Sequence, residues 1–340
     1  MRNSIAFAFP FVVSLTSVVA CMTEIEDSSL SNDHDSAESS SSDSSGDTAS
    51  GDTADTDTDT DTDDVDRPDP EYGLSTQTLV HDEVEREYLQ YVPESYDGST
   101  AVPVMLSFHG FGGRANDQMG MSDMRDLAES ENFILIYPQG TRLEGFTHWN
   151  TYLPGGENKS EADDFGFVDA MLDVVSADYA IDSSRVYATG FSNGADFTYT
   201  LACYLSDRVT AIAPVSGLMW YETRNDCEPT HPTAVLHIHG TRDNDRPYDG
   251  IDGYLHSVED GLAHWAEENG ITADSTMTEL ESGGRTVERY RYEGGDGGVS
   301  MTLYKVIRGQ HDWLSIEDDG VETDRLIWDF LSAHDQDGAL

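Results

Sequence analysis

The sequence predicts one α/β domain with a mostly parallel central sheet flanked by helices. From about residue 72 onward, strand-like and helix-like segments alternate along the chain. This alternation is typical of a parallel sheet covered by helices. The roughly 270 residues that carry it are enough for a single domain of this class, and no internal repeat is visible in them.

The strand predictions rest on runs of β-branched, aromatic and aliphatic residues. Residues 86–92 and 102–108 alternate or run apolar, and residues 133–137 form an uninterrupted apolar run that is followed by Pro138 and Gly140. A strand that is buried on both faces has this pattern. Four further strands are expected, at residues 185–189, 209–215, 233–239 and 301–307.

Helices are predicted where apolar residues recur at helical spacing. A first helix should lead into strand 185–189, because the spacing is clear at Phe167, Val168, Met171, Leu172 and Val175. Further helices are expected at residues 195–205, 255–268 and 321–333. The glycine-rich residues 282–284 and 294–298 should form surface turns.

Residues 1–21 have the pattern of an export signal. Arg2 lies in a short basic start, and residues 5–20 form an apolar run too short for a comfortable membrane span. Small and aliphatic residues precede Cys21, as in a bacterial lipoprotein signal, whose cysteine carries lipid. We therefore expect an extracellular or cell-surface lipoprotein, at the outer membrane or secreted. The alternative is an ordinary cleaved signal with an incidental cysteine, and it also predicts export.

Residues 22–72 are expected to be a disordered acidic tether to a catalytic domain at residues 73–340. The tether is rich in Ser, Thr, Asp and Gly, and residues 56–64 alternate Thr and Asp almost completely. Such a segment has no apolar surface to bury. A calcium loop would also need a glycine turn and a closing glutamate, both of which are missing, so no metal site is expected.

The charge of the chain excludes one class of partner. Its formal net charge is −48, and residues 22–71 hold only 18 of the 66 acidic side chains, so most of the acidity lies in the domain. The two lysines are Lys159 and Lys305. Nucleic acid is excluded as a partner because phosphate binding needs a basic surface. An acidic surface with few lysines suggests a saline environment, with family drift as the alternative.

The cysteines predict one disulfide. If Cys21 takes lipid, Cys203 and Cys227 remain as a pair, and in an exported domain a pair is expected to be bonded. The bond would connect the helix at 195–205 to a loop after residue 215. It would close a loop of about 25 residues and contribute on the order of 3 kcal/mol.

Gly190-Phe191-Ser192-Asn193-Gly194 is the most informative motif of the chain. It matches G-x-S-x-G, a tight strand-to-helix turn that exposes a serine hydroxyl. The motif stands between the predicted strand 185–189 and the predicted helix 195–205, where this turn belongs. Ser192 is therefore the candidate nucleophile.

A serine nucleophile needs a base, an acid that orients the base, and an oxyanion site. Asp243 follows strand 233–239 and His311 follows strand 301–307, so both lie at the sheet edge where catalytic groups gather. The competing acids are Asp245 and Asp249. The other histidines considered, each with an ordinary structural interpretation, are His237, His239, His264 and His334.

The predicted oxyanion site is the segment His109-Gly110-Phe111-Gly112-Gly113, directly after strand 102–108. It is similar to the HGGG-type loop that presents a backbone amide to the developing negative charge. The expected donors are the amides of Phe111 and Asn193. His109 itself is expected to be a structural hydrogen-bonding residue at the edge of the pocket rather than a base.

Longer motifs resemble the polyhydroxybutyrate depolymerase and feruloyl esterase group, over roughly residues 86–331. They are Asp163-Asp164-Phe165-Gly166-Phe167, the run from Asp182 to Gly194, Leu201-Ala202-Cys203, Ala213-Pro214-Val215-Ser216-Gly217, Cys227-Glu228-Pro229, His239-Gly240-Thr241-Arg242-Asp243 and Gly309-Gln310-His311-Asp312-Trp313.

This resemblance implies an α/β-hydrolase fold and a secreted serine esterase that needs no cofactor. The ester substrate would be a polyester, or feruloyl or acetyl groups on plant polysaccharide. It also implies Ser192 as nucleophile, Asp243 as acid and His311 as base. The only expected membrane contact is the lipid anchor. Two other functions stay open: a prolyl-oligopeptidase-like peptidase, and an acidic surface-binding module with a relict site.

The chain departs from the family pattern near the mouth of the site. Gln310 and Asp312-Trp313 stand where the family usually has a second glycine and Trp-Pro, and Arg246-Pro247-Tyr248 stands for Val-Pro-Tyr. These departures concern the substrate rather than the reaction. Residues 146–156, with Trp149, Tyr152 and Pro154, are expected to form part of the acyl pocket, and core packing is the alternative for Trp149. Trp313 is a further candidate for the pocket lining.

Overall fold

The computed structural model describes residues 67–153, 156 and 158–340. The chain divides into two units, Met1–Thr62 and Asp63–Leu340, and only the second contains described residues. The predicted signal peptide, Cys21 and the predicted tether up to residue 66 lie outside the described residues. Within the part that is described, no helix is both long enough and apolar enough to cross a membrane.

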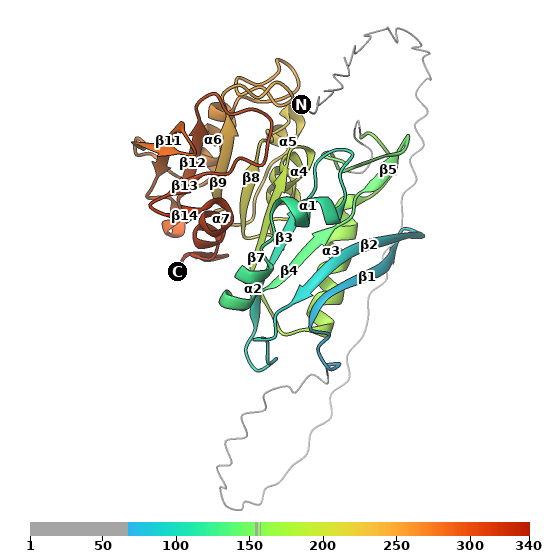
Figure 1. Cartoon of the computed structure of the whole chain (residues 1–340). Coiled ribbons are helices and arrows are strands. Elements are labelled where there is room, and N and C mark those ends of the chain that lie inside the picture. The colour runs from blue at the N-terminus through green and yellow to red at the C-terminus, as the bar shows by residue number, and fades with distance from the viewer. Residues whose placement is uncertain (1–66, 154–155, 157) are drawn as a thin grey trace, which may run out of the picture. The chain divides into compact units, whose positions relative to one another are not determined.

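A ten-stranded sheet forms the centre of the domain, in the order β1-β2-β4-β3-β7-β8-β9-β12-β11-β10 (Figure 1). The six strands from β4 to β12 in this order are parallel to one another. The hairpin β1-β2 at one edge and strands β11 and β10 at the other are antiparallel. The predicted sheet, mostly parallel and flanked by helices, is therefore confirmed.

The strands of this sheet are β1 Gly73–His81, β2 Val84–Val92, β3 Val102–Phe108, β4 Ile134–Pro138, β7 Ile181–Phe191, β8 Ala211–Val215, β9 Ala234–Gly240, β10 Thr276–Ser282, β11 Arg285–Tyr292 and β12 Met301–Val306. Three small hairpins lie outside it: β5 Thr141–Leu143 with β6 Phe146–His148, β13 Glu317–Asp318 with β14 Val321–Glu322, and β15 His334–Asp335 with β16 Gly338–Ala339. The helices are α1 Ala115–Met121, α2 Arg125–Glu131, α3 Asp164–Asp178, α4 Asn193–Tyr204, α5 Tyr221–Asn225, α6 Val258–Glu268 and α7 Thr323–Leu331, with one 3-10 turn, η1 Asp296–Gly298.

Helices cover both faces of the sheet. One core contains the apolar sides of α3, α4 and α6, and the other contains α1, α2 and α7. Successive residues of the central strands alternate between the two cores: in β3, Val104 and Leu106 face the first and Met105 faces the second. This follows from the period of two along a strand, and it explains why strands β3, β4, β8 and β9 are buried at every position.

The edges of the sheet differ most from what the sequence predicts. The domain was expected to begin at residue 73 with its first strand at 86–92, but β1 already adds a strand over Gly73–His81. Strands β10 and β11 were not predicted, although the expected turn at 282–284 connects them. Gly283 and Gly284 both have positive φ, 57° and 75°, as a two-residue hairpin turn requires.

Cys203 and Cys227 form the predicted disulfide. It joins the last turn of α4 to the loop after α5, across 24 residues of sequence. Both cysteines are buried, with 4% and 7% of their surface exposed. The bond therefore holds α4, the helix that follows Ser192, against the chain that leads to β9.

Removing this bond should lower stability more than activity at low temperature. We expect the Cys203→Ala/Cys227→Ala variant to lose about 3 kcal/mol of unfolding free energy, because the unfolded chain regains the entropy of an open loop. Urea titrations of the variant and of the reduced wild type measure this difference. Unchanged unfolding midpoints in both would contradict the prediction.

Candidate active site

Ser192 occupies a strained turn between β7 and α4. Its backbone has φ 55° and ψ −119°, a region that non-glycine residues rarely adopt and that costs roughly 1–3 kcal/mol. The flanking glycines make the turn possible. A Cβ on Gly190 would lie 2.6 Å from the carbonyl carbon of Gly194, and one on Gly194 would lie 2.4 Å from the backbone oxygen of Phe108. The motif at 190–194 thus has the geometry of a nucleophile elbow.

The structure brings Ser192, His311 and Asp243 together. Ser192 Oγ lies 2.9 Å from His311 Nε2, and His311 Nδ1 lies 2.7 Å from Asp243 Oδ2. The three residues follow β7, β12 and β9, whose carboxyl ends share one edge of the sheet. With Nδ1–H donating to the carboxylate, Nε2 is free to accept the serine proton.

The loop after β9 holds Asp243 as an ionised acceptor. Its Oδ1 accepts hydrogen bonds from the backbone amides of Asp245, at 2.9 Å, and Arg246, at 2.7 Å. Burial acts to raise the pKa of Asp243, but the hydrogen bonds from His311 and the Arg246 amide outweigh it, so the pKa is lowered. The competing acid Asp245 is exposed and contributes its backbone to this arrangement.

The two expected oxyanion donors lie on either side of Ser192 in the fold. Asn193 is the first residue of α4, where a helix has no internal acceptor for the backbone amide. Phe111 lies in the turn after β3 and lines the same hollow as Ser192. Its ring is half exposed and stacks on Phe146, with 5.7 Å between the ring centres. The turn is secured by a 2.7 Å hydrogen bond from the Gly112 amide to the Thr147 carbonyl.

His109 is buried beneath this turn. Its Nε2 accepts the Gly140 amide at 2.9 Å, so Nδ1 carries the proton and donates to the Gly110 carbonyl at 2.8 Å. Burial lowers the pKa of His109 to about 4, which keeps the ring neutral at pH 7. His109 therefore positions the oxyanion loop from below.

The two candidate pocket tryptophans differ in position, because Trp149 borders the small hollow beside Ser192 while packing in the core, and Trp313 lies away from both hollows. Trp149 is fully buried: its indole donates to the His109 carbonyl at 2.9 Å and stacks on Phe197. The prediction that Trp313 lines the substrate pocket is wrong, because it is absent from the lining of the hollow at Ser192. Its indole donates to Asp324 at 3.2 Å and packs with the core of α7, lining a separate hollow that shares no residue with the one at Ser192. The chain turns after His311, so the side chains of His311 and Trp313 lie on different sides.

Seven residues line the hollow at Ser192, whose volume is about 440 Å³. They are Phe111, Lys159, Ser192, Trp220, Asp245, Arg246 and His311. A smaller hollow of about 160 Å³ lies beside it and shares Lys159 and Trp220. Its lining also includes the aromatic side chains of Tyr152 and Tyr254. The site thus has a main hollow and an aromatic side pocket.

Sequence reasoning missed several residues of this lining. Nothing near Lys159 or Trp220 in the sequence signals that they approach Ser192, because the loops that carry them meet only in three dimensions. The side chain of Asn193 was also missed. It exchanges two hydrogen bonds with the backbone of Trp149, at 2.8 and 3.1 Å, and so fixes the segment next to the oxyanion loop.

Histidines 237 and 239 form a buried chain behind the acid. His239 Nε2 lies 2.8 Å from the Arg246 carbonyl, so it must donate, and Nδ1 is left to accept from His237 Nε2 at 3.0 Å. His237 Nδ1 then accepts the Tyr199 hydroxyl at 2.5 Å. Burial lowers the pKa of both histidines. They are strand residues, as expected, and they also anchor the loop that carries Asp243.

Buried neutral histidines should make the domain sensitive to acid. Burial lowers the pKa of His109 and of His264 to about 4 in the folded protein. Between pH 6.5 and 4 the unfolded chain takes up protons that the folded chain does not, so stability falls as the pH falls. From pH 7 to 5, each histidine should remove about 2 kcal/mol of unfolding free energy.

The His264→Leu variant isolates one of these contributions. His264 Nε2 has no hydrogen-bond partner among the described residues, so leucine removes a buried polar atom and its titration together. Urea titrations at pH 7 and pH 5 should show a smaller loss for the variant than for the wild type. An equal loss in both proteins would contradict the assignment.

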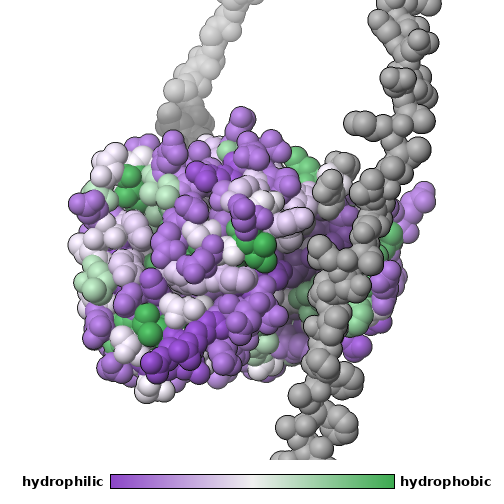
Figure 2. Space-filling model, turned by 90° about the horizontal axis from the view of Figure 1, so that it is seen from above, coloured by the Kyte–Doolittle hydropathy of each residue, from purple (hydrophilic) through white to green (hydrophobic). Residues whose placement is uncertain are grey.

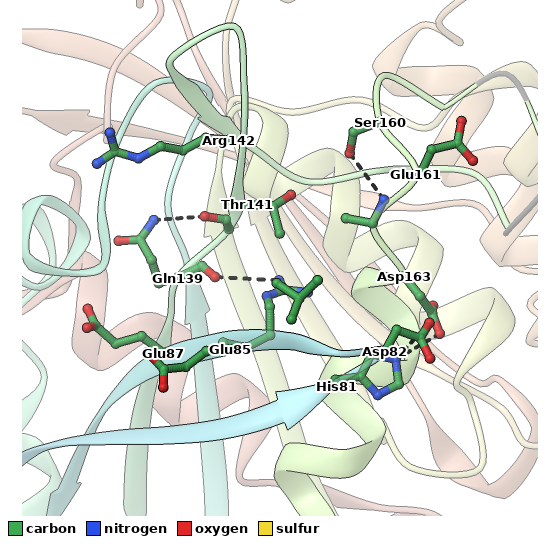
Figure 3. Close-up of a pocket in the computed structure, with 14 residues that line it drawn as sticks. His81, Asp82, Glu85, Glu87, Gln139, Thr141, Arg142, Ser160, Glu161 and Asp163 are labelled. Atoms are coloured by element: carbon green, nitrogen blue, oxygen red, sulfur yellow. Dashed lines mark hydrogen bonds and ion pairs between the residues drawn. The ribbon is translucent and has the colours of Figure 1, made fainter.

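Three groups of side chains in the described part of the chain have spacing suitable for a metal ion, and other contacts explain each of them. Cys203 and Cys227 are bonded to each other, and Asp243 belongs to the hydrogen-bonded trio. The third group, His81, Asp82 and Asp163, lies at one end of a hollow of about 690 Å³ (Figure 3). There His81 pairs with Asp163 at 3.0 Å, and Asp163 also caps α3 by accepting the Gly166 amide. This group therefore connects the β1-β2 hairpin to α3.

Comparison with known proteins identifies the family. The family model described as esterase PHB depolymerase matches residues 87–230. A probable feruloyl esterase C of Aspergillus clavatus is 30% identical over 232 residues, covering 67% of this chain and 76% of that protein. The chain belongs to the polyhydroxybutyrate depolymerase and feruloyl esterase group. This places it among carboxylic ester hydrolases.

Other members of this esterase group are longer. A bifunctional acetylxylan esterase/xylanase of Neocallimastix patriciarum is 28% identical over 240 residues, which cover 70% of this chain but 32% of that protein. Feruloyl esterase B of Piromyces equi is 26% identical over 256 residues, covering 72% of this chain and 45% of that protein. The chain thus spans less than half of these two relatives.

A solved structure supports the α/β-hydrolase fold of the group. The acetyl xylan esterase from Aspergillus awamori superposes with a TM-score of 0.54 at 17% sequence identity, covering 76% of this chain and 99% of that one. At this identity the likeness concerns the fold.

Proposed function

We propose that the protein is an exported, lipid-anchored serine esterase that hydrolyses carboxylic esters through an acyl-serine intermediate. The observation that carries the proposal is the chain of short contacts from Ser192 through His311 to Asp243, in a strained turn at the carboxyl edge of the sheet. The esterase family supports the reaction class. Export and the anchor rest on the signal-like residues 1–21 and on Cys21.

The mechanism follows from the positions of the proton donors and acceptors. Ser192 Oγ attacks the ester carbonyl carbon while its proton passes to His311 Nε2. The carbonyl oxygen becomes an oxyanion, which the amides of Phe111 and Asn193 stabilise, each by about 2.7–4 kcal/mol. When the tetrahedral intermediate collapses, the C–O bond breaks and His311 returns the proton to the leaving alcohol.

The second half of the reaction reverses these roles. A water molecule gives its proton to His311 Nε2 and attacks the acyl carbon, and the resulting intermediate expels Ser192, which regains the proton. Asp243 stabilises the imidazolium in both halves and stays ionised, because its pKa is lowered. The reaction as proposed requires no cofactor.

The ester itself is proposed to be a polyester, or a feruloyl or acetyl ester on plant polysaccharide. The side pocket at Tyr152, Trp220 and Tyr254 supports the aromatic acyl group, because a volume of about 160 Å³ between aromatic side chains suits one substituted ring. A release assay tests the choice by comparing polyhydroxybutyrate film, methyl ferulate and acetylated xylan at one salt concentration. Release of hydroxybutyrate or acetate without any ferulate would overturn the aromatic assignment.

Labelling with a fluorophosphonate tests the reaction class directly. The folded protein should lose its ester hydrolysis as one adduct forms on Ser192, located by peptide mass spectrometry. Hydrolysis of dipeptidyl substrates in preference to short-chain esters would favour the alternative of a prolyl-oligopeptidase-like peptidase. Absence of any adduct on the folded protein would favour the alternative of a surface-binding module with a relict site. The face of the domain drawn in Figure 2 is predominantly hydrophilic, and the chain is strongly acidic. Membrane fractionation of the Cys21→Ser variant tests the anchor.

A further inference from the structure

Two of the few cations of this acidic chain line the hollow at Ser192. Lys159 and Arg246 come from different loops and lie in the same lining as Ser192 and His311. The chain has 18 basic side chains against 66 acidic ones and two lysines in total. One of those two lysines therefore stands at the proposed reaction site, although the chain as a whole repels anions.

Arg246 is held so that part of its guanidinium remains available. Its Nε and Nη2 bind the carboxylate of Asp196, at 3.0 and 2.7 Å, and its Nη1 donates to the Asp245 carbonyl at 3.1 Å. A guanidinium has five N–H groups, so one N–H on Nη1 and one on Nη2 keep no acceptor among the described residues. Guanidinium N–H groups that are left without an acceptor suit a carboxylate.

The acids that balance Arg246 are hidden below the surface of the hollow. Asp196 is completely buried and also accepts the Leu218 amide at 2.8 Å, whereas the Arg246 side chain keeps 17% of its surface exposed. Asp243 is likewise buried and bonded to His311. The one remaining carboxylate in the lining, Asp245, is exposed, and solvent weakens its effect on a bound anion.

Lys159 supplies a second donor from the opposite loop. It is exposed, and its ammonium lies 5.5 Å from the centre of the Phe111 ring. It lines both the main hollow and the aromatic side pocket. A ligand in the main hollow thus meets the guanidinium of Arg246 and the ammonium of Lys159 in the same lining as the proposed nucleophile.

We propose that this hollow takes esters that carry a carboxylate close to the scissile bond, and that Lys159 and Arg246 bind that carboxylate. The inference rests on the proposed esterase function and narrows its substrate class. Such a carboxylate occurs at the acid end of a short oligoester and on the uronic acid units of a polysaccharide.

The test compares two substrates that differ only in charge. The linear dimer of 3-hydroxybutyrate is offered to the full-length protein as the free acid and as its terminal amide, and the released hydroxybutyrate is measured by chromatography. For the wild type, kcat/KM should be higher for the free acid than for the terminal amide. In the Lys159→Gln variant the ratio of kcat/KM for the acid to kcat/KM for the amide should be about tenfold smaller, because a charged hydrogen bond is replaced by a neutral one. The Lys159→Arg variant should keep most of the ratio.

Lys305 provides the matched control. It lies on β12, 4.7 Å from the ring centre of Tyr248 and 3.6 Å from Glu259, outside the lining of the hollow. Lys305→Gln removes the same charge from the chain and should leave the preference unchanged. A second variant, Asp196→Met with Arg246→Met, removes the guanidinium without leaving a buried carboxylate unpaired, and it should also lower the preference.

A second pair of substrates distinguishes the two sources of the carboxylate. O-acetylated methyl glucuronoside is compared with its glucuronamide, and the pair with the larger Lys159-dependent preference identifies the source. Equal rates for acid and amide in both pairs, or a preference that survives Lys159→Gln, would overturn the inference. Aryl ester hydrolysis and fluorophosphonate labelling of the same wild-type sample show separately whether the esterase function stands.

Discussion

Ser192→Ala should lower ester hydrolysis by roughly 10⁵- to 10⁶-fold, because it removes the atom that carries the acyl group. The substitution deletes one oxygen that contacts His311 at 2.9 Å, and it leaves the glycines of the turn in place. The measurement is kcat for a p-nitrophenyl ester, together with fluorophosphonate labelling, which should disappear.

Two controls separate this chemical effect from a folding effect. The unfolding midpoint of the variant should be close to that of the wild type, because alanine tolerates the turn about as well as serine does. Ser216→Ala serves as the matched substitution. Ser216 also has a positive φ, 52°, but its hydroxyl donates to the Asp312 carbonyl, so its loss should change stability more than chemistry. Full activity of Ser192→Ala would refute the assigned nucleophile.

Asp243→Asn should lower kcat by about 10⁴-fold. Asparagine has a single carbonyl oxygen, which the backbone amides of Asp245 and Arg246 would occupy, so its NH2 group would donate to His311 Nδ1. This favours the tautomer of His311 in which Nε2 carries the proton. That tautomer cannot accept the proton of Ser192. The fold should persist, since the side chains have the same shape.

The pH profile distinguishes loss of the acid from general damage. With Asn at position 243 the remaining activity should rise toward alkaline pH, where hydroxide replaces the missing base. Asp245→Asn is the matched control, because its carboxylate is exposed and its hydrogen bond to Asp243 comes from its backbone amide. If Asp245→Asn loses as much kcat as Asp243→Asn, the acid has been assigned to the wrong residue.

The parts of the fold that the sequence predicted are those with strong local signals. Strand β3 was predicted over its full length, since a strand buried on both faces is apolar at nearly every position. Ser192, Asp243 and His311 were expected to lie together because each follows a strand of the parallel sheet, and parallel strands bring their carboxyl ends to one edge; the structure places the three side chains in contact. The turn at 282–284 was predicted because two adjacent glycines are typical of a tight turn.

The parts that were missed depend on contacts between distant segments. Strand β10 has mostly exposed residues, so its sequence lacks the pattern of a buried strand and pairing with β11 decides its conformation. The Asp196–Arg246 pair joins residues 50 positions apart, and neither residue is unusual locally. Trp313 was expected at the pocket because of its position after His311, but a contact with Asp324 in α7 determines where it packs.

The order of strands along the chain has a consequence for when the protein becomes active. His311 follows β12, which pairs with β9 and is the last of the six parallel strands to leave the ribosome. Ser192 and His311 are 119 residues apart, so a chain truncated or nicked before β12 would contain the elbow without a base. Contacts over such distances form late and slowly. The enzyme should therefore stay inert during synthesis and gain activity only when its carboxyl-terminal strands have joined the sheet.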